Sequence, residues 1–240
     1  MKEYLQQKVN ITLTDSMVEK LNVYCDFLRA ENEKYNLTAI TEVEQIWQKH
    51  FVDSILGSVA IPTGATLCDV GSGAGFPSLP LKIVRDDISV TLVDSLQKRI
   101  DFTKILCEKI AVSASFFHER AEDFAKNHSE QFDVATARAV APLNILLEYV
   151  AQIVKVGGAV VAYKTDCSEV DDAKYAATLL GLRFETHHDF VLPDGSKRSI
   201  LVYRKAKSTP RKYPRGQNKP RTSPLSMRTG ASRVVFEVGE

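Results

Sequence analysis

The residue types best suited to chemistry occur in the stretch CDVGSGAGFPSLPL, residues 68–81, which has a glycine at every second position from Gly71 to Gly75. Glycine lets the backbone turn sharply and approach a ligand closely. A P-loop would need Gly-Lys followed by Ser or Thr, but Phe76 and Pro77 come next. A dinucleotide-binding G-x-G-x-x-G would need its third glycine at position 76. Both phosphate-binding interpretations therefore fit poorly.

The spacing that remains is D-x-G-x-G-x-G, with Asp69 followed by Gly71, Gly73 and Gly75, and it suits S-adenosylmethionine (SAM). SAM has no pyrophosphate, and its charged groups are a carboxylate, an ammonium and a sulfonium. We expect the turn to present backbone N–H and C=O groups to the amino-acid end of SAM, and Asp69 to neutralise positive charge nearby. The alternative is that the glycines serve only a tight turn between a strand and a helix.

Acidic residues follow the next two predicted strands. Asp94 ends the run SVTLVD (89–94), at a position where an acid accepts hydrogen bonds from the ribose hydroxyls of a nucleoside. Its alternative role is an ion pair with Lys98 or Arg99 on the following helix. After the next strand, Ala121 and Glu122, with Asp123, would lie beside an adenine ring, with a backbone N–H on a ring nitrogen and an acid on the exocyclic amine. Because ligands of open sheets bind at the carboxyl ends of the strands, these positions converge with the glycine turn.

The elements that must position these residues begin at residue 65, where short apolar runs alternate with helix-length amphipathic stretches. This alternation predicts an α/β fold with parallel strands and helices on both faces. The turn segment PDGSK separates the last two runs and predicts an antiparallel hairpin. We therefore expect a Rossmann-like, seven-stranded sheet with one reversed strand. The predicted strands span 65–70, 89–94, 114–119, 132–138, 158–164, 183–192 and 198–204, and the helices between them span 77–85, 96–109, 142–154 and 168–180.

The first 60 residues predict a small helical extension. In residues 14–30, Thr14 or Asp15 can cap the start, and apolar residues recur on one face. A second helix is expected from about 41 to 57. The segment YNLTAI (35–40) between them breaks the helical pattern.

Charge is distributed unevenly along the chain. Residues 1–203 carry 21 Lys and Arg against 28 Asp and Glu, whereas residues 204–233 carry ten Lys and Arg and no acid. Residues 204–233 also hold almost no large apolar residues, so we expect 206–240 to be a flexible basic tail that is either solvated or an arm for a polyanion. Tyr213 among several arginines favours RNA as that polyanion.

The composition argues against two other classes of protein. No apolar run reaches the roughly 18 residues needed to span a bilayer, and the N-terminus lacks the apolar core of a secretion signal, so we expect a cytoplasmic protein. The four cysteines are scattered without a C-x-x-C pair, which argues against a zinc site and fits reduced thiols. We expect neither a metal nor a membrane.

Longer segments support a resemblance that covers nearly the whole chain. They are YNLTAI (35–40), KHFVDSI (49–55), DVGSGAGFPSLPL (69–81), LVDSLQKRIDF (92–102), RAEDF (120–124), ATARAVAPL (135–143) and YPR…PL (213–225). In these segments, and in their order, the chain resembles the bacterial small-subunit ribosomal RNA methyltransferase G family, also called GidB. It departs in the tail, where YPRGQNKP lacks the family's lysine and further glycine, and in the residues after PL.

This resemblance implies a SAM-dependent enzyme that methylates N7 of one guanine in 16S ribosomal RNA. It implies a SAM-dependent methyltransferase domain over 61–205, between the helical extension 1–60 and the tail 206–240. Carried over by position, it also implies cofactor contacts, which lie at Gly71, Phe76, Ala121, Glu122 and Arg138.

Guanine N7 has a free lone pair, so its methylation needs no general base, and the enzyme's main task is alignment. Arg138, at the end of the fourth strand, is the predicted catalytic residue and could bind guanine O6, an RNA phosphate or SAM; the alternative is an ion pair with an acid such as Glu122. Lys164, at the end of the fifth strand, is a candidate phosphate contact. Asn36 and His50 are candidates for the RNA entrance, although His50 is equally compatible with a packed helix residue.

In the tail, Arg211, Lys212 and Arg215 are predicted RNA contacts whose contribution falls with salt. The predicted partners are 16S rRNA and the small ribosomal subunit, with the protein acting as a monomer. Two alternatives remain open: a SAM-dependent methyltransferase for another acceptor, and a non-catalytic rRNA-binding assembly factor. SAM binding separates the second alternative from an enzyme.

Overall fold

The computed structural model describes residues 1–138 and 141–226, and its centre is a single sheet. The seven strands are β1 (Thr66–Val70), β2 (Ser89–Asp94), β3 (Ser115–His118), β4 (Phe132–Arg138), β5 (Val154–Lys164), β6 (Leu182–Val191) and β7 (Lys197–Lys205). Their order is β3-β2-β1-β4-β5-β7-β6. Strand β7 runs antiparallel to both of its neighbours, and the other pairs are parallel. The predicted seven-stranded α/β sheet with one reversed strand is confirmed.

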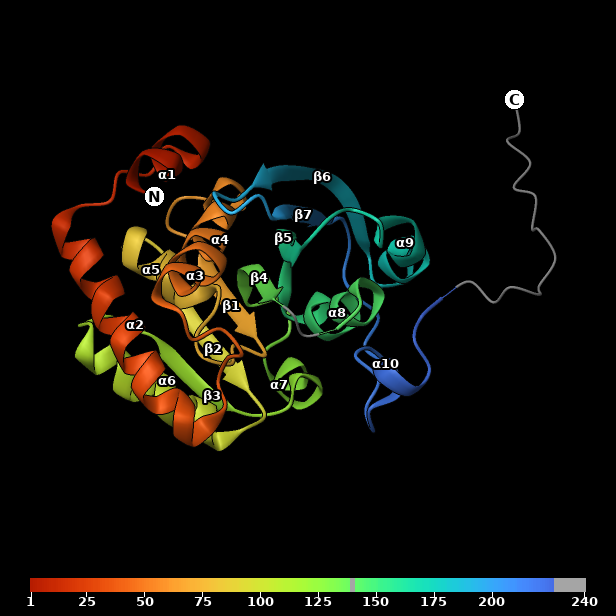
Figure 1. The fold of residues 1–240 in the computed structure, drawn as a ribbon. Helices are drawn as coiled ribbons and strands as arrows, with labels where there is room; N and C mark the ends of the chain where they lie inside the picture. The colour runs from red at the N-terminus through yellow and green to blue at the C-terminus, as the bar shows by residue number, and fades with distance from the viewer. Residues whose placement is uncertain (139–140, 227–240) are drawn as a thin grey trace, which may run out of the picture.

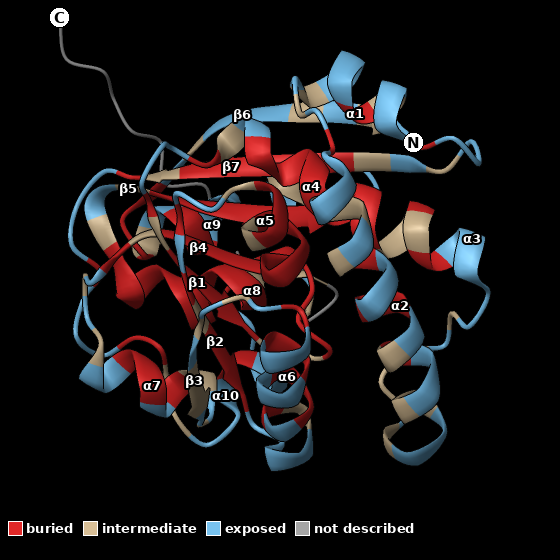
Figure 2. Cartoon of the chain, turned by 90° about the vertical axis from the view of Figure 1, so that its left-hand side faces the viewer, coloured by how far each residue is buried: buried red, intermediate tan, exposed pale blue. Residues whose placement is uncertain are grey.

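Helices cover both faces of the sheet (Figure 1). One layer holds α2 (Asp15–Tyr35), α5 (Ser78–Val84) and α6 (Gln97–Lys109), and the other holds α7 (Ala121–Asn127), α8 (Leu143–Val150) and α9 (Val170–Leu179). Adjacent strand residues serve opposite layers, since Leu67 and Leu92 belong to one buried cluster while Cys68 and Val93 belong to the other. Figure 2 shows the buried strands between helices whose outer faces are exposed.

The N-terminal helices share a core with the sheet. Besides α2, they are α1 (Lys2–Val9), which the sequence pattern did not predict, and the run α3 (Val43–Ile46), η1 (Trp47–Val52), α4 (Asp53–Leu56) and η2 (Gly57–Ala60). The hydroxyl of Thr14 accepts a hydrogen bond from the Met17 N–H and caps α2, as predicted. Tyr24 and Phe51 are fully buried in the same cluster as Leu67 of β1. The predicted second helix is interrupted by a π-helical turn, η1.

Part of the basic tail packs onto the body, which differs from the expectation of a flexible tail. Tyr213 and Leu225 are buried in the cluster beneath α8, and the Thr209 hydroxyl donates to the Leu180 carbonyl at 2.7 Å. A short helix, α10 (Lys219–Thr222), lies beside α8 (Figure 1). The sequence contains too few apolar residues here to predict this packing, because two side chains, Tyr213 and Leu225, bury the segment against the body. Tail residues 227–240 lie outside the described residues.

Candidate active site

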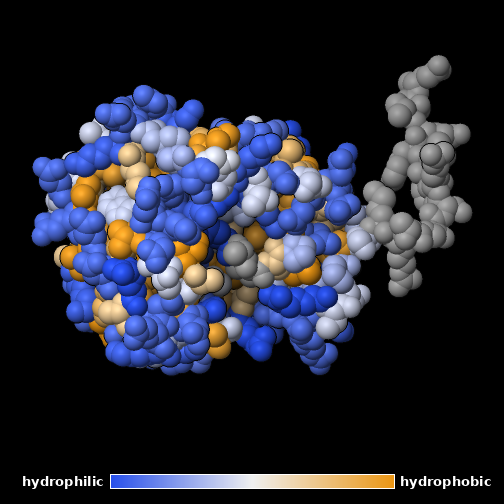
Figure 3. All heavy atoms as spheres, viewed as in Figure 1, coloured by the Kyte–Doolittle hydropathy of each residue, from blue (hydrophilic) through white to orange (hydrophobic). Residues whose placement is uncertain are grey.

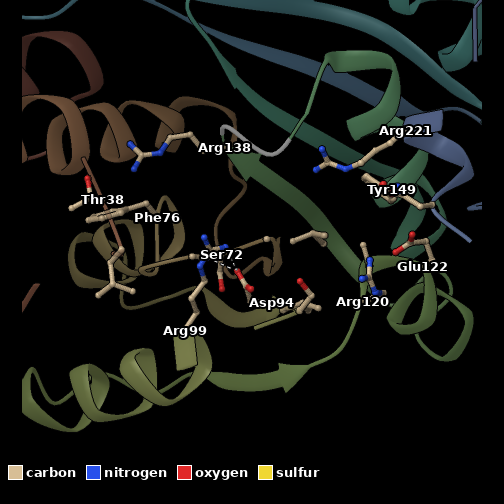
Figure 4. Close-up of a pocket in the computed structure, with 18 of the residues that line it drawn as sticks. Thr38, Ser72, Phe76, Asp94, Arg99, Arg120, Glu122, Arg138, Tyr149 and Arg221 are labelled. Carbon is tan, nitrogen blue, oxygen red and sulfur yellow. Dashed lines mark hydrogen bonds and ion pairs between the residues drawn. The ribbon is translucent and has the colours of Figure 1, made fainter. Parts of the chain in front are cut away.

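A cavity of about 410 Å³ opens at the carboxyl ends of β1, β2 and β4. The face drawn in Figure 3 is hollowed near its centre, and Figure 4 shows side chains from several elements around the cavity. Most of the residues predicted for the cofactor line it. These are Gly71, Gly73, Phe76, Asp94, Ala121, Glu122 and Arg138.

The glycine turn uses its own amides to hold its shape. Gly71, Gly73 and Gly75 have φ angles of 74°, 57° and 94°, in the left-handed region that favours glycine. The N–H of Gly71 donates to the Val93 carbonyl at 2.8 Å, and that of Gly73 to Asp94 Oδ2 at 2.9 Å. These two N–H groups are therefore engaged within the protein, so of the expected backbone contacts with a ligand those through the C=O groups of the turn remain a prediction.

The hydroxyl of Ser72 is a group that this turn offers to a ligand. Ser72 lines the cavity and is only 2% exposed, and its Oγ has no hydrogen-bond partner among the described residues. A buried polar atom without a partner is costly, so a polar ligand group in the cavity would satisfy it.

Asp69 and Gly75 shape the turn from behind and do not line the cavity. Asp69 is fully buried, and its Oδ2 accepts hydrogen bonds from the Ser78 hydroxyl at 2.6 Å and the Ser78 N–H at 3.3 Å. Burial raises the pKa of Asp69 to about 7. A Cβ at position 75 would lie 2.5 Å from Leu79 Cδ1 and 2.9 Å from the Tyr24 hydroxyl, so only glycine fits there.

Asp94 ends β2 and links two loops at the cavity. Its Oδ1 accepts from the Leu96 N–H at 3.0 Å, while its Oδ2 accepts from Gly73 and lies 3.4 Å from Arg99. The ion pair with Arg99, considered as an alternative role, is present. A carboxylate offers about four lone-pair sites, and these contacts use three, so Asp94 keeps one site for a ribose hydroxyl and gains a second only where the 3.4 Å contact with Arg99 is released.

A second end of the cavity forms where α7 begins. Ala121 and Glu122 lie there together with Tyr149 of α8 and Arg221 of α10 (Figure 4). Tyr149 and Arg221 share a side-chain hydrogen bond. Sequence analysis missed both, because a helix face and a tail segment reach this end only through tertiary packing. Asp123, by contrast, pairs with Lys126 on the surface.

Arg138 points into the opposite end, where the N-terminal helices meet β4. Its Nη1 donates to Asp53 Oδ2 at 2.8 Å and to the Lys49 carbonyl at 3.1 Å, and its Cζ lies 4.8 Å from the centre of the Phe76 ring. The ion-pair partner is therefore Asp53 and not the suggested Glu122. Asp53 is 4% exposed and also lies 3.1 Å from Arg198 Nε, so one carboxylate serves two arginines.

Sequence analysis did not single out Asp53. A usable signal was its place three residues after His50, which puts both side chains on one helical face.

His50 joins Arg138 to the loop before α3. Arg138 Nη2 lies 3.1 Å from His50 Nδ1, and Thr38 Oγ1 lies 2.8 Å from His50 Nε2. The imidazole stacks on Phe76 with ring centres 4.6 Å apart. Burial, followed by the charge of Arg138, lowers the pKa of His50 to about 3, so the ring is neutral near pH 7. His50 thus lines the cavity and is packed at the same time.

The other predicted substrate residues lie outside the cavity wall. Asn36 ends α2 in a left-handed conformation and is exposed, and the two residues after it line the cavity instead. Lys164 Nζ donates to the Ala141 carbonyl at 3.0 Å and to Glu169 at 2.8 Å. Arg211 and Lys212 are exposed.

Arg215 is an anchor for the tail. Its backbone N–H, Nε and Nη2 donate to the fully buried Glu148 at 2.9, 2.8 and 2.7 Å. This ion pair holds the segment that brings Asn218 and Arg221 to the cavity.

Two structural features bear on the classes of protein considered above. Across residues 1–138 and 141–226, no group of three or more His, Cys, Asp or Glu side chains is arranged to hold a metal ion. Within the same residues, no helix is both long and apolar enough to cross a membrane.

Solved structures with a similar fold include several methyltransferases of low sequence identity. A TYW2 from M. jannaschii, described in complex with AdoMet, aligns with a TM-score of 0.54 at 10% identity, over 66% of this chain and 77% of that one. The tRNA (m1A58) methyltransferase TrmI from Aquifex aeolicus aligns with a TM-score of 0.50 at 14% identity, over 66% and 69%. At such identities the likeness concerns the fold.

Sequence relatives are much closer. A protein of Bacillus licheniformis named "Ribosomal RNA small subunit methyltransferase G" is 44% identical over 227 residues, which cover 91% of this chain and 95% of the relative. One of Bacillus cereus with the same name is 43% identical over 229 residues, covering 92% and 95%. The family model "GidB: rRNA small subunit methyltransferase G" matches residues 17–196. The chain therefore belongs to the GidB family of rRNA small subunit methyltransferase G proteins.

Proposed function

We propose that this protein transfers a methyl group from SAM to N7 of a guanine in the 16S rRNA of the small ribosomal subunit. The observation that carries the proposal is the cavity at the ends of β1, β2 and β4 in a chain that belongs to this family. Asp94, the first residues of α7 and Arg138 all line this cavity.

The donor set of the cavity fits SAM. Asp94 would hold the ribose hydroxyls, and the Ala121 N–H and the Glu122 carboxylate would hold the adenine edge. The unpartnered hydroxyl of Ser72 would contact the amino-acid end. When bound, SAM supplies a methyl group on a positively charged sulfonium.

The residues around Arg138 would align the guanine and require no base. N7 carries a free lone pair, and His50 is neutral with both ring nitrogens already engaged. The rings of Phe76 and His50 and the fixed guanidinium form a rigid wall, which favours positioning as the source of rate. Arg138, held in place by these contacts, would present its remaining N–H groups to the substrate in a fixed orientation.

Charge balance at this wall suits the reaction. Methylation leaves a positive charge on the guanine ring, and an uncompensated arginine beside it would raise the barrier. Asp53 lies 2.8 Å from Arg138 and offsets part of that charge before the substrate binds, since the same carboxylate also pairs with Arg198. Preorganised charges of this kind stabilise a transition state without reorganisation during the reaction.

The exposed side chains of Arg211 and Lys212 are proposed to contact rRNA phosphates, which makes binding salt-dependent. Lys164 and Arg215 are instead committed to Glu169 and Glu148, and their role in RNA binding is indirect. Asn36 lies at the rim and would meet RNA beside the cavity. The protein acts as a monomer in the cytoplasm, and no metal takes part.

The test is methyl transfer in vitro. Small subunits lacking native modification are incubated with the protein and methyl-labelled SAM, and the RNA is digested to nucleosides. We expect label in 7-methylguanosine, and its loss in the Gly71→Asp variant, because position 71 lines the cavity and its φ of 74° disfavours any side chain. SAM binding without any label on subunits or free 16S rRNA would contradict the proposal and point to another acceptor.

A further inference from the structure

The loop that carries Thr38 is held rigidly against the cavity. Asn32 Oδ1 accepts hydrogen bonds from the N–H groups of Leu37 and Thr38 at 2.7 and 2.9 Å, and Asn32 Nδ2 donates to the Thr38 carbonyl at 2.9 Å. One amide side chain thereby satisfies three backbone groups of an irregular segment. Thr38, which lines the cavity, has a fixed backbone position.

The hydrogen bonds that the Thr38 oxygen accepts determine where its own proton can lie. An arginine only donates, so His50 Nδ1 must accept from Arg138 at 3.1 Å. In a neutral imidazole the proton then resides on Nε2, and this group donates to Thr38 Oγ1 at 2.8 Å. The Ile40 N–H donates to the same oxygen at 3.0 Å. Both lone pairs of the hydroxyl oxygen are thus occupied.

The hydroxyl proton of Thr38 is therefore left for the cavity. No described residue accepts a hydrogen bond from it. In Figure 4, Thr38 lies with Phe76 and Arg138, at the end away from Glu122 and Tyr149. If the adenosine of SAM occupies the end near Glu122, the acceptor guanine must approach at the end near Thr38.

We propose that the Thr38 hydroxyl donates a hydrogen bond to O6 of the target guanine and so selects guanine at this site. This inference rests on the proposed function. The edge of guanine that carries N7 offers two acceptors, N7 and O6, whereas adenine offers N7 and the N6 amine, a donor. A fixed donor at O6 orients guanine and leaves the N7 lone pair free for the methyl group. The same donor would face the amine of adenine.

The test uses Thr38→Val, which keeps the shape and removes the hydroxyl, both as the donor to O6 and as the acceptor from His50 and Ile40, and Thr38→Ser, which keeps the hydroxyl. Thr41→Val is the matched control, since it makes the same chemical change at an exposed position three residues along. For each protein, kcat/KM for 7-methylguanosine formation on small subunits and the Kd for SAM are measured. Thr38→Ala is a second donor-free variant in case the valine variant does not fold.

Loss of one donor to a buried acceptor should lower kcat/KM about 10- to 100-fold in Thr38→Val. We expect Thr38→Ser and Thr41→Val to stay within about fivefold of the wild type, and the Kd for SAM to change less than about twofold. A Thr38→Val enzyme with wild-type kcat/KM would overturn the inference, as would an equal loss in Thr38→Ser. A loss explained by weaker SAM binding would assign the hydroxyl to the cofactor. A wild-type protein that forms no 7-methylguanosine would instead refute the proposed function.

Discussion

At the scale of single residues, the site depends on charges that are fixed before any ligand arrives. Asp53 is the central one, because it pairs with Arg138 on β4 and with Arg198 on β7. Its side chain is only 6% exposed, so solvent cannot replace it. Removing one partner of a buried ion pair leaves an uncompensated charge.

We predict that Asp53→Asn destabilises the fold by about 3 kcal/mol, the scale measured when buried pairs are broken. Denaturant unfolding measures the change, with Asp123→Asn as control. Asp123 pairs with Lys126 at side-chain exposures of 60% and 61%, so that control should change the free energy of unfolding by less than about 1 kcal/mol. Equal effects of the two substitutions would contradict a special role for Asp53.

His50 gives a prediction in pH. Its pKa is about 3 in the fold, because of burial and the Arg138 charge, against about 6.5 in an unfolded chain. Between these values the unfolded state binds a proton that the folded state does not, so the free energy of unfolding falls as pH drops from about 6.5. In His50→Gln this part of the acid dependence should vanish. The direct measurement is an NMR titration, and a His50 signal that titrates near pH 6.5 would contradict the account.

At the scale of elements, the π-helical turn η1 positions the groups that bind Arg138. In the π-helical turn η1, the Asp53 N–H donates to the carbonyls of Gln48 and His50. The Lys49 carbonyl, which a regular α-helix would use for that bond, accepts from Arg138 at 3.1 Å instead. Turns of this type occur often at functional sites, and here the turn aims both a carbonyl and an imidazole at one guanidinium.

Gly75, in the turn between β1 and α5, and Gly64, just before β1, form a matched pair of glycines. Gly75→Ala should destabilise the protein by about 3 kcal/mol, since it adds a left-handed strain of about 1–2 kcal/mol and a clash of similar size. Gly64 also has a positive φ, 69°, but a Cβ there meets nothing within 4 Å. Gly64→Ala should therefore lose only about 1 kcal/mol. Thermal or denaturant unfolding distinguishes them, and similar losses would mean that the contacts with Tyr24 and Leu79 do not matter.

The sequence pattern predicted the positions of those site residues that lie at the end of a predicted strand. Strand-end positions such as Asp94 and Arg138 could be placed at one edge of the sheet, because apolar runs alternate with helices and parallel strands share a polarity. Thr38 and Tyr149 could not, because they reach the cavity from a loop and a helix whose docking depends on tertiary packing. Asp53, which contacts Arg138 and does not line the cavity, could not be placed for the same reason. The internal hydrogen bonds of the turn's N–H groups could not be predicted for a related reason, since their acceptors lie on β2.

At the scale of the whole molecule, the first helices and the last described segment meet the same cavity from opposite sides. The N-terminal part contributes Thr38 and His50, and the tail contributes Asn218 and Arg221. The tail is anchored by Arg215 on the buried Glu148. Basic residues close together in the tail therefore have different tasks, and charge alone does not distinguish them.

We predict that Arg215→Ala raises amide hydrogen exchange across residues 213–222 and weakens SAM binding, because the anchored segment forms part of the cavity wall. Arg211→Ala removes the same charge from an exposed position and should leave both unchanged, while it lowers rRNA affinity and the salt dependence of binding. Hydrogen exchange and calorimetry test the first effect, and binding at several salt concentrations tests the second. Identical behaviour of the two variants would refute this division of tasks.

The central claim is methylation of guanine N7 in 16S rRNA, and site-specific cleavage tests it most directly. Reduction followed by aniline breaks RNA at 7-methylguanosine, so 16S rRNA is taken from cells that lack their own enzyme and express this chain or its Gly71→Asp variant. The account predicts one additional break with the wild-type chain and none with the variant. A soluble, SAM-binding wild-type chain that produces no break would contradict it.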